Sequence, residues 1–329
     1  EMIIFDTKLS DSEQAKINYY LSKKWRLEDR MDSDGDGFND TSEETSGTSP
    51  IDSSDYPQFD FSDTVDEQIN EASGLDSIES NLSLWLDASN IDMLSNSSLS
   101  DGDAISTWKD LSGNGNNGQQ SVTNEQPLFD SDGLNGMAGL DLDGTNDSFK
   151  LKTGAIINSS YTMFFVAQYE LKDTSSVMFS QYDSSTSGRM NIQLFEPSDD
   201  TAELWSWAGT GYKVSDVVSS NTPFIYTTKN NNRVVDGWAY GGTKSDTGTI
   251  SITADAPDVD NYIGKQTLSS NQYFQPFKGV ISEIVIFDTA LTDDQIIKIQ
   301  YYLSKKWGLE STVDSDGDGY MDSLEEVAG

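Results

Sequence analysis

Two short stretches of the sequence carry acidic residues at the same spacing. Asp32-Ser-Asp34-Gly-Asp36-Gly37 and Asp314-Ser-Asp316-Gly-Asp318-Gly319 each open a twelve-residue segment that closes on a glutamate. Alternate side chains of a tight loop point inward, the central glycine permits the sharp turn, and the next residue offers its carbonyl oxygen. This pattern predicts two EF-hand-like calcium loops. The predicted ligands are Asp32, Asp34, Asp36, Phe38, Asp40 and Glu43 in the first loop, and Asp314, Asp316, Asp318, Tyr320, Asp322 and Glu325 in the second.

The composition restricts the metal chemistry to oxygen ligands. The chain has no cysteine and no histidine, so thiolate sites, disulfides and the usual zinc ligand are excluded. Fifty-six acidic against twenty basic residues give a net charge of −36 among 329 residues. Such a field repels nucleic acid and anionic membranes, and divalent cations would screen it. We therefore expect Ca2+ as the cofactor, and neither nucleic acid nor membrane insertion.

An acidic, solvated turn is the alternative interpretation of each loop, and two full matches in one chain argue against it. Each loop follows the Trp-x-Leu-Glu end of a predicted helix instead of directly continuing an EF-hand helix. This arrangement does not favour a calcium sensor that opens a groove. It favours a loop that stiffens a junction between domains.

The loops belong to a longer internal repeat. Residues 1–47 align without a gap to residues 283–329 and are identical at 28 of 47 positions. The repeat predicts a parent protein that is a tandem array, in which this chain holds the end of one repeat, a linker and a complete further repeat. Because Glu1 falls inside a predicted strand, we expect the chain to be a fragment or processed product.

Each copy of the repeat contains the same three parts. A strand is predicted at Ile3–Phe5 and again at Ile284–Phe287. A capping box follows, Ser10 with Glu13 in one copy and Thr292 with Gln295 in the other. A helix then carries an apolar stripe that should lie on a sheet, with Lys305 and Lys306 facing water. The stripe consists of Ile17, Tyr20, Leu21 and Trp25 in the first copy and of Ile299, Tyr302, Leu303 and Trp307 in the second.

From about Leu82 to Asp288 the sequence changes to short alternating runs separated by Gly, Asn, Asp and Ser. This pattern is typical of an antiparallel sandwich. We predict an all-β fold, an antiparallel jelly-roll β-sandwich with one C-terminal packing helix, plus EF-hand-like calcium loops. The predicted organisation is 1–30, the strand and helix of a preceding repeat; 31–55, a calcium loop; 56–80, a linker in which Val65–Ile78 could be helical; 81–310, the jelly roll; and 311–329, the next calcium loop.

Several motifs carry a resemblance to known families. The loops, with the trailing Gly47-Thr48-Ser49-Pro50, resemble bacterial thrombospondin type 3 repeats. Residues 81–310 resemble a bacterial laminin-G-like, concanavalin-A-like jelly roll through Leu84–Ser89, Trp108–Asn116 and Leu142–Asp147. The arrangement is similar to repeat regions of large secreted adhesins. The resemblance implies an extracellular location, at the cell surface or secreted. It also suggests a rim calcium held by Asp87, Asp110, Asp143 and Asp147, whose alternative role is to cap backbone amides in turns.

Catalysis is not expected. Retaining glycosidases of related folds need two carboxylates about 5 Å apart, usually on alternate residues of one strand. The sequence offers no Glu-x-Asp-x-Glu or Glu-x-Asp-x-x-Glu pattern, and no serine has a histidine to activate it. We therefore predict that the chain is not an enzyme.

Two non-enzymatic functions are left. The first is a calcium-stabilised structural or adhesive repeat of a large surface or filament-forming protein, whose partners are neighbouring copies or repeats. The second is a carbohydrate-binding, lectin-like module, in which aromatic faces stack on sugar rings. The candidate ligand-binding residues are Trp205, Trp207, Tyr212, Trp238 and Tyr240. Aromatic residues on strands are more often core residues than sugar platforms.

Overall fold

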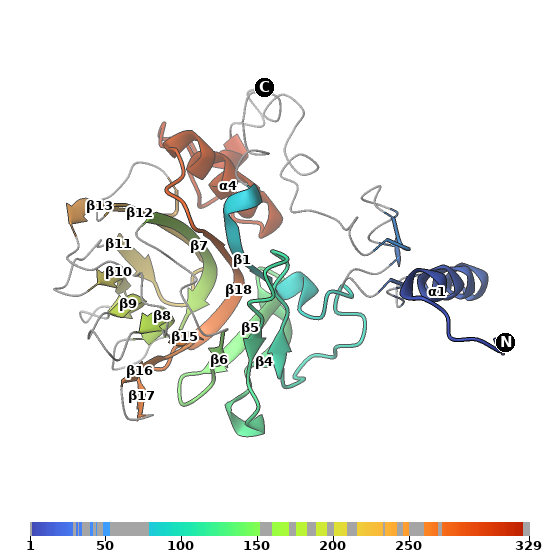
Figure 1. The fold of residues 1–329 in the computed structure, drawn as a ribbon. Coiled ribbons are helices and arrows are strands. Elements are labelled where there is room, and N and C mark those ends of the chain that lie inside the picture. Colours follow the sequence, from blue (N-terminus) through green and yellow to red (C-terminus); the bar gives the residue numbers. More distant parts are fainter. Residues whose placement is uncertain are drawn as a thin grey trace. The chain divides into compact units, whose positions relative to one another are not determined.

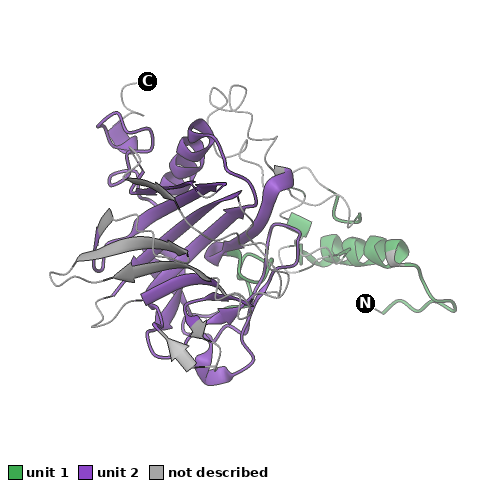
Figure 2. Cartoon of the chain, turned by 60° about the vertical axis from the view of Figure 1, so that its left-hand side comes forward, with its two compact units in different colours: residues 1–60, 90–99 green, residues 61–89, 100–329 purple. Residues whose placement is uncertain are grey.

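The computed structural model describes residues 2–28, 31, 33–34, 40–41, 44, 49–52, 79–151, 160–170, 176–182, 189–195, 201–208, 216–232, 234–241, 246–249, 260–268 and 272–324. The backbone forms two compact units (Figure 2). One comprises residues 1–60 and 90–99, and the other residues 61–89 and 100–329. The prediction of a helix within Val65–Ile78 lies outside the described residues, as does most of the predicted linker 56–80.

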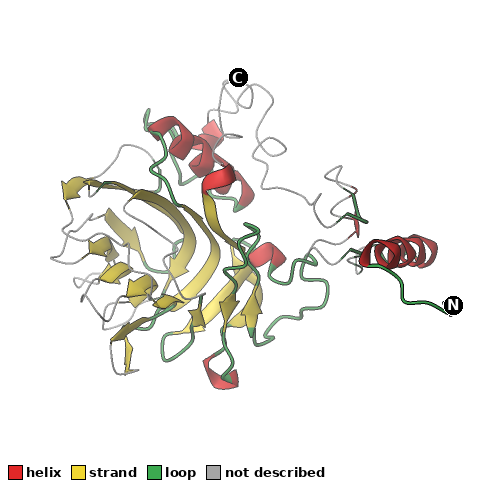
Figure 3. Cartoon of the chain, in the orientation of Figure 1, coloured by secondary structure: helices red, strands yellow, loops and turns green. Residues whose placement is uncertain are grey.

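The larger unit is dominated by antiparallel strands (Figures 1 and 3). The described strands form two eight-stranded sheets and a small ribbon. The first sheet contains β1 (Leu82–Asp87), β4 (Leu128–Leu134), β5 (Met137–Asp143), β7 (Ser160–Tyr169), β12 (Phe224–Asn231), β13 (Val234–Ala239), β14 (Asp246–Thr249) and β18 (Lys278–Phe287). The second contains β2 (Thr107–Trp108), β3 (Gly118–Gln119), β6 (Phe149–Lys150), β8 (Ser176–Tyr182), β9 (Arg189–Phe195), β10 (Thr201–Ala208), β11 (Asp216–Ser219) and β15 (Asp260–Ile263). The ribbon pairs β16 (Gln266–Leu268) with β17 (Gln272–Phe274).

The centre of the first sheet is buried on both faces. In β18 every residue after Lys278 is buried, and β7 is buried from Tyr161 to Ala167. Strands covered on both sides lose the alternation of apolar and polar residues. One face of these strands contributes to the sandwich core, and the other is covered by a helix. This is the predicted antiparallel β-sandwich with a packing helix.

The covering helix is α4 (Asp293–Lys306). It begins with the predicted capping box, because Thr292 accepts from the Gln295 backbone and Gln295 from the Thr292 backbone. The predicted stripe is buried, and Trp307 is only 1% exposed. On its sheet-facing side, Gln300 donates to the hydroxyl of Thr227 on β12 at 2.9 Å. Figure 1 shows α4 beside β1 and β7.

The smaller unit contains α1 (Asp11–Trp25), the first copy of this helix, with an intact capping box at Ser10 and Glu13. The segment before it differs from the prediction. Residues 2–5 adopt no strand, although their counterparts lie in β18. A strand is held by ladder hydrogen bonds from a neighbour, and the described structure pairs none with this segment. The prediction of a strand at Ile3–Phe5 is therefore wrong for this chain.

Three 3-10 turns lie at Glu79–Asn81, Ala88–Asn90 and Thr123–Glu125. No described helix is both long and apolar enough to cross a membrane.

Candidate functional site

Three predicted calcium ligands lie together in the second loop. The side chains of Asp314, Asp316 and Asp318 place carboxylate oxygens within 4.8 Å of one another. The loop holds them there through its own backbone, because Asp314 accepts from the amides of Gly317 (2.8 Å) and Gly319 (3.0 Å). Asp316 and Asp318 in turn accept from the backbone amides two residues further on. The fold thus concentrates negative charge at the position where the pattern predicts a cation.

Asp322, the ninth residue of the loop, has a different position. It is fully buried, and it accepts hydrogen bonds from the Ser304 hydroxyl of α4, the Ser315 hydroxyl and the Ser315 amide. Burial raises the pKa of the Asp322 carboxyl, and these hydrogen bonds act in the opposite direction. Asp322 therefore fastens the loop to the helix. Position nine of such loops often reaches the ion through a water molecule, which is compatible with this arrangement.

The second loop is also fastened to the sandwich. The amide of Asp314 donates to the carbonyl of Tyr240 at 3.2 Å, and Gly241 forms a parallel bridge with Asp314. A Cβ atom at Gly241 would come within 2.6 Å of the Asp314 carbonyl oxygen, so this approach requires glycine. Helix, loop and first sheet are joined at this point.

The first loop repeats the attachment. Asp40 is fully buried and accepts from the hydroxyls of Ser22 on α1 and Ser33, and from the Ser33 amide at 3.0 Å. Backbone bonds also match, since Asp40 donates to Met31 as Asp322 does to Val313. We call this shared unit, helix plus anchored loop, the helix–loop module. Of the other predicted ligands, Asp34 is half-buried and Tyr320 exposed, whereas Asp32, Asp36, Phe38, Glu43 and Glu325 lie outside the described residues.

The donor set of the second loop fits a hard divalent cation. All its candidate ligands are oxygen atoms, as calcium prefers. A carboxylate can accept about four interactions, so the single backbone bond at Asp316 or Asp318 leaves capacity for a metal ion. The chemistry that a bound ion would supply is electrostatic, the neutralisation and cross-linking of these carboxylates.

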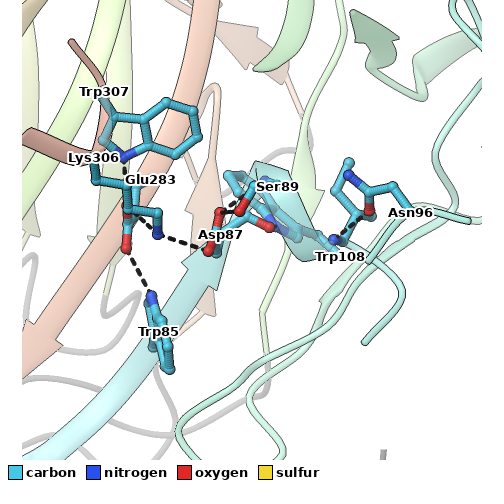
Figure 4. A network of polar contacts seen from close by, with 9 residues as sticks. Trp85, Asp87, Ser89, Asn96, Trp108, Glu283, Lys306 and Trp307 are labelled. Atoms are coloured by element: carbon cyan, nitrogen blue, oxygen red, sulfur yellow. Dashed lines mark hydrogen bonds and ion pairs between the residues drawn. The ribbon is translucent and has the colours of Figure 1, made fainter. Parts of the chain in front are cut away.

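Within the second module, a buried ion-pair cluster attaches α4 to the first sheet (Figure 4). The ammonium of Lys306 lies 2.7 Å from Asp87 of β1 and 2.8 Å from Glu283 of β18. Glu283 also accepts from the indole nitrogens of Trp85 (2.8 Å) and Trp307 (2.5 Å). Burial by itself lowers the pKa of Lys306, but the charges of Asp87 and Glu283 raise it well above its usual value. The prediction that Lys306 faces water is therefore wrong.

The four suggested rim-calcium residues act as turn caps. Asp87 accepts from the amide and hydroxyl of Ser89, and Asp143 from the amides of Thr145 and Asn146. Asp147 accepts from the Asp143 amide at 3.0 Å, and burial raises the pKa of Asp147 to about 6.

Asp110 caps the turn that covers β1, accepting from the amides of Trp85, Ser112 and Asn116. In the same turn, the side-chain amides of Asn114 and Asn116 donate to carbonyls of β1. The Trp108–Asn116 motif thus lies over the first strand of the sandwich. Its polar residues hold the turn in place through hydrogen bonds to β1.

The aromatic candidates for sugar binding are not brought together as one exposed surface in the described part of the chain. Trp238 is 4% exposed, and the Lys229 ammonium lies 5.4 Å from its ring centroid. Tyr240 is half-buried, and burial raises its pKa. Trp205 and Trp207 are on β10, but their side chains lie outside the described part, as does the whole of Tyr212. Burial of Trp238 contradicts its role as an exposed platform.

A cavity that sequence reasoning missed lies on the second sheet. It has a volume of about 610 Å³ and is lined by residues of β3, β6 and β15 and of the segments that flank these strands. Its lining includes Gln119, Gln120, Glu125, Lys150, Tyr262 and Lys265. Volumes of roughly 300–1,000 Å³ are typical of small-molecule sites. No local motif marks these residues, because separate strands supply them.

Comparison with known proteins adds little to this description. No family model and no curated protein matches the chain. Among solved structures, domain 4 of the extracellular arabinanase AbnA from Geobacillus stearothermophilus, solved with arabinotriose, has 17% identity and a TM-score of 0.48 over 65% of this chain and 96% of that domain. The SAP-like pentraxin of Limulus polyphemus has 12% identity and a TM-score of 0.42 over 55% of this chain and 86% of the pentraxin.

The carbohydrate-binding module of the Ruminococcus gnavus IT-sialidase, solved with α2,3-sialyllactose, has 13% identity and a TM-score of 0.40, covering 49% of this chain and 95% of that module. Sialidase from Trypanosoma rangeli matches over 33% of its own length. At these TM-scores and identities the likeness carries no information on ligand or activity. The chain itself is an antiparallel β-sandwich of jelly-roll type, with one packing helix over its first sheet.

Proposed function

We propose that this chain is a calcium-stabilised structural or adhesive repeat of a larger extracellular protein. The observation that carries the proposal is the duplicated helix–loop module. Both copies anchor their loop through the same buried aspartate, Asp40 or Asp322, bonded to the same helical serine, Ser22 or Ser304. A solvated acidic turn has no need of such an anchor, whereas a loop that must hold several carboxylates close together does.

In this proposal calcium changes the stiffness of the joint. Without a cation the clustered carboxylates of Asp314, Asp316 and Asp318 repel one another, and the repulsion is relieved by opening the loop. A divalent ion bridges them and favours the closed loop. Because the loop is joined to α4 at Ser304 and to the sandwich at Tyr240, a closed loop fixes the direction in which the chain leaves the sandwich.

The partners in this proposal are other copies or repeats of the same kind. Helix α4 buries its apolar stripe on the sandwich. In the first copy of the repeat, Trp25 at the end of α1 is 54% exposed, and Phe5 in the segment before α1 is 44% exposed. We propose that residues 1–28 dock on a sandwich of a neighbouring copy or repeat. An exposed stripe of this kind costs roughly 1.5–3 kcal/mol for each large side chain that could be buried.

Thermal melting of the whole chain with calcium and with a chelator tests the proposal. We expect calcium to raise the midpoint, since binding contributes about 4 kcal/mol per site at a thousandfold excess over Kd. Replacing both Asp316→Asn and Asp318→Asn removes two carboxylates from one loop and should remove part of that gain. The matched control is Asp132→Asn, an exposed aspartate on β4 outside both loops. Equal midpoints with calcium and with chelator would contradict the proposal.

Glycan binding is a second candidate function, and the cavity on the second sheet favours it. The cavity combines amide, carboxylate and ammonium groups, which are groups that bind sugar hydroxyls and charged sugar substituents. Calorimetric titration of the chain with neutral and acidic saccharides tests this candidate. Absence of binding to neutral and acidic saccharides alike would exclude it and would leave the calcium-dependent repeat untouched.

A further inference from the structure

The cavity of the second sheet is built on a row of cross-strand neighbours. Gln119 of β3 pairs with Lys150 of β6, and Lys150 pairs with Tyr262 of β15. Residues directly opposite one another on adjacent strands project from the same face of a sheet. The next residue on β15, Ile263, is fully buried in the core. The row therefore lies on the outer face of the second sheet, where it forms the floor of the cavity.

Two lysines converge on the tyrosine of this row. The ammonium of Lys150 lies 5.7 Å from the centroid of the Tyr262 ring, and that of Lys265 lies 5.1 Å from it. Both are cation–π distances. Tyr262 itself is only 8% exposed. A ring covered in this way cannot serve as a stacking platform for a neutral sugar, so the chemistry of the cavity is that of its charges.

The charges of the lining favour an anion. Lys150 and Lys265 bring two ammonium groups into the cavity, and Glu125 brings one carboxylate. Lys150 also has an ion pair with Asp260 at 2.7 Å, with both side chains about half exposed. This pairing of two cations is unusual in a chain with 20 basic and 56 acidic residues. Because Asp260 neutralises one of the two cations, an anionic ligand would be attracted chiefly by Lys265.

Lys265 gives the strongest indication. It is 8% exposed, and its backbone is fixed because its carbonyl accepts from the buried hydroxyl of Ser180 at 2.8 Å. Burial lowers the pKa of Lys265, with the Glu125 charge acting in the opposite direction. A buried ammonium is costly unless charges or hydrogen bonds compensate it. An anion in the cavity would add a favourable contact to this ammonium.

We propose that this cavity binds a saccharide that carries a carboxylate or sulfate group, with Lys265 and Lys150 contacting the anionic group. Amides of the lining, from Gln119 and Asn117, then face the sugar hydroxyls. The proposal rests on the second candidate function, glycan binding, and adds to it the position of the site and the class of ligand. It does not depend on calcium in the loops.

Calorimetric titration with trigalacturonic acid, with its methyl ester and with inorganic sulfate separates the possibilities. The ester has the same sugar rings without the charges, and sulfate has the charge without the rings. We expect the acid to bind at least tenfold more tightly than either. Binding should weaken at least tenfold in Lys265→Met and severalfold in Lys150→Met. The matched control is Lys278→Met, because Lys278 also has a surface ion pair, 2.7 Å from Glu170, and lies outside the cavity.

Each other result overturns a defined part of the proposal. Equal binding of acid and ester contradicts the anionic ligand and leaves glycan binding in place. Equal binding of acid and sulfate contradicts a saccharide ligand. Unchanged affinity in both cavity variants, with a melting midpoint like that of wild type, moves the site elsewhere. No binding of the acid contradicts the proposal, whereas the second candidate function is excluded only if the neutral and acidic saccharides of the wider titration also fail to bind. Should Lys265→Met fail to fold, Lys150→Met decides, since its side chain is about half exposed.

Discussion

Helices α1 and α4 share a capping box, a Leu-Ser-Lys-Lys-Trp ending and an anchored loop, and they differ in what covers them. Trp307 is 1% exposed and its counterpart Trp25 is 54% exposed. Leu309 and Leu27 differ in the same way, at 2% and 40%. The hydrogen bonds of the buried aspartate are the same in both copies, so local sequence is sufficient for them. Burial of the stripe requires a sheet, which the larger unit supplies to α4, whereas the described residues of the smaller unit contain no strand.

The two copies also differ at positions that contact the sheet. Ile296 is buried in α4, and its counterpart in α1 is the exposed Gln14. Gln300, which bonds Thr227 of β12, corresponds to Asn18, which donates to the Ser33 carbonyl in its own loop. A surface that receives α1 therefore need not be identical to the one beneath α4. The module is therefore repeated as a unit within this chain, while the face that docks on a sheet differs between its two copies.

Truncation of the two tryptophans tests the comparison with the largest effect. We expect Trp307→Ala to lower the free energy of unfolding by about 3–5 kcal/mol, because a buried aromatic ring leaves a cavity. Trp25→Ala should change it by less than about 0.5 kcal/mol in dilute solution. Urea unfolding at low protein concentration measures both. A similar loss in both variants would show that Trp25 is buried under those conditions.

Removal of the lysine charge comes next. Lys306→Met should lower the free energy of unfolding by about 3 kcal/mol, because Asp87 and Glu283 are then buried without a cation. Lys24→Met is the matched control in α1, where the ammonium lies over the Tyr20 and Trp25 rings at the surface. We expect it to be neutral within about 0.5 kcal/mol.

A second variant separates charge from packing at this cluster. Adding Glu283→Gln to Lys306→Met should recover part of the loss, since one buried charge is then removed. No recovery in the double variant would mean that the aliphatic part of Lys306, and not its charge, stabilises α4.

The ends of the two helices give the smallest effect. Arg26 adopts a left-handed conformation, with φ 56° and ψ 55°, and at the equivalent position Gly308 has φ 60°. Left-handed backbone costs a non-glycine residue about 1 kcal/mol. Arg26→Gly should therefore stabilise the first module, and Gly308→Arg destabilise the second, by about 1 kcal/mol each. Hydrogen exchange of the α1 amides and thermal melting, respectively, measure these changes. A destabilising Arg26→Gly or a stabilising Gly308→Arg would contradict the equivalence of the two helix ends.

Sequence periodicity was sufficient for much of the fold. The alternating runs predicted between Leu82 and Asp288 contain strands such as β9, and the capping boxes begin both helices where expected. These features depend on side-chain alternation and on contacts three or four residues apart. The strand at Ile3–Phe5 failed because a strand also needs a neighbour, which its own sequence does not supply.

The candidate sites were predictable only where their residues are close in sequence. The aspartates of the loops follow a local spacing, so Asp314, Asp316 and Asp318 were found. Lys306 was misplaced because its partner Asp87 lies 219 residues away. The cavity was missed for the same reason, since Lys150 and Tyr262 meet only through sheet pairing. No pattern along the chain distinguishes such a lysine from a solvated one.

The pairing of the first and last strands has a mechanical consequence. Leu82 at the start of β1 lies opposite Phe287 at the end of β18. The chain therefore enters β1 and leaves β18 on the same side of this strand pair. A pulling force applied at Leu82 and Phe287 would break the hydrogen bonds between β1 and β18 one pair after another. It would not be shared by all of these hydrogen bonds at once. The pair at the far end of that ladder is Asp87 with Glu283, the two carboxylates that Lys306 joins. The ion-pair cluster is thus placed where a sandwich pulled in series would meet its last resistance before the two strands separate.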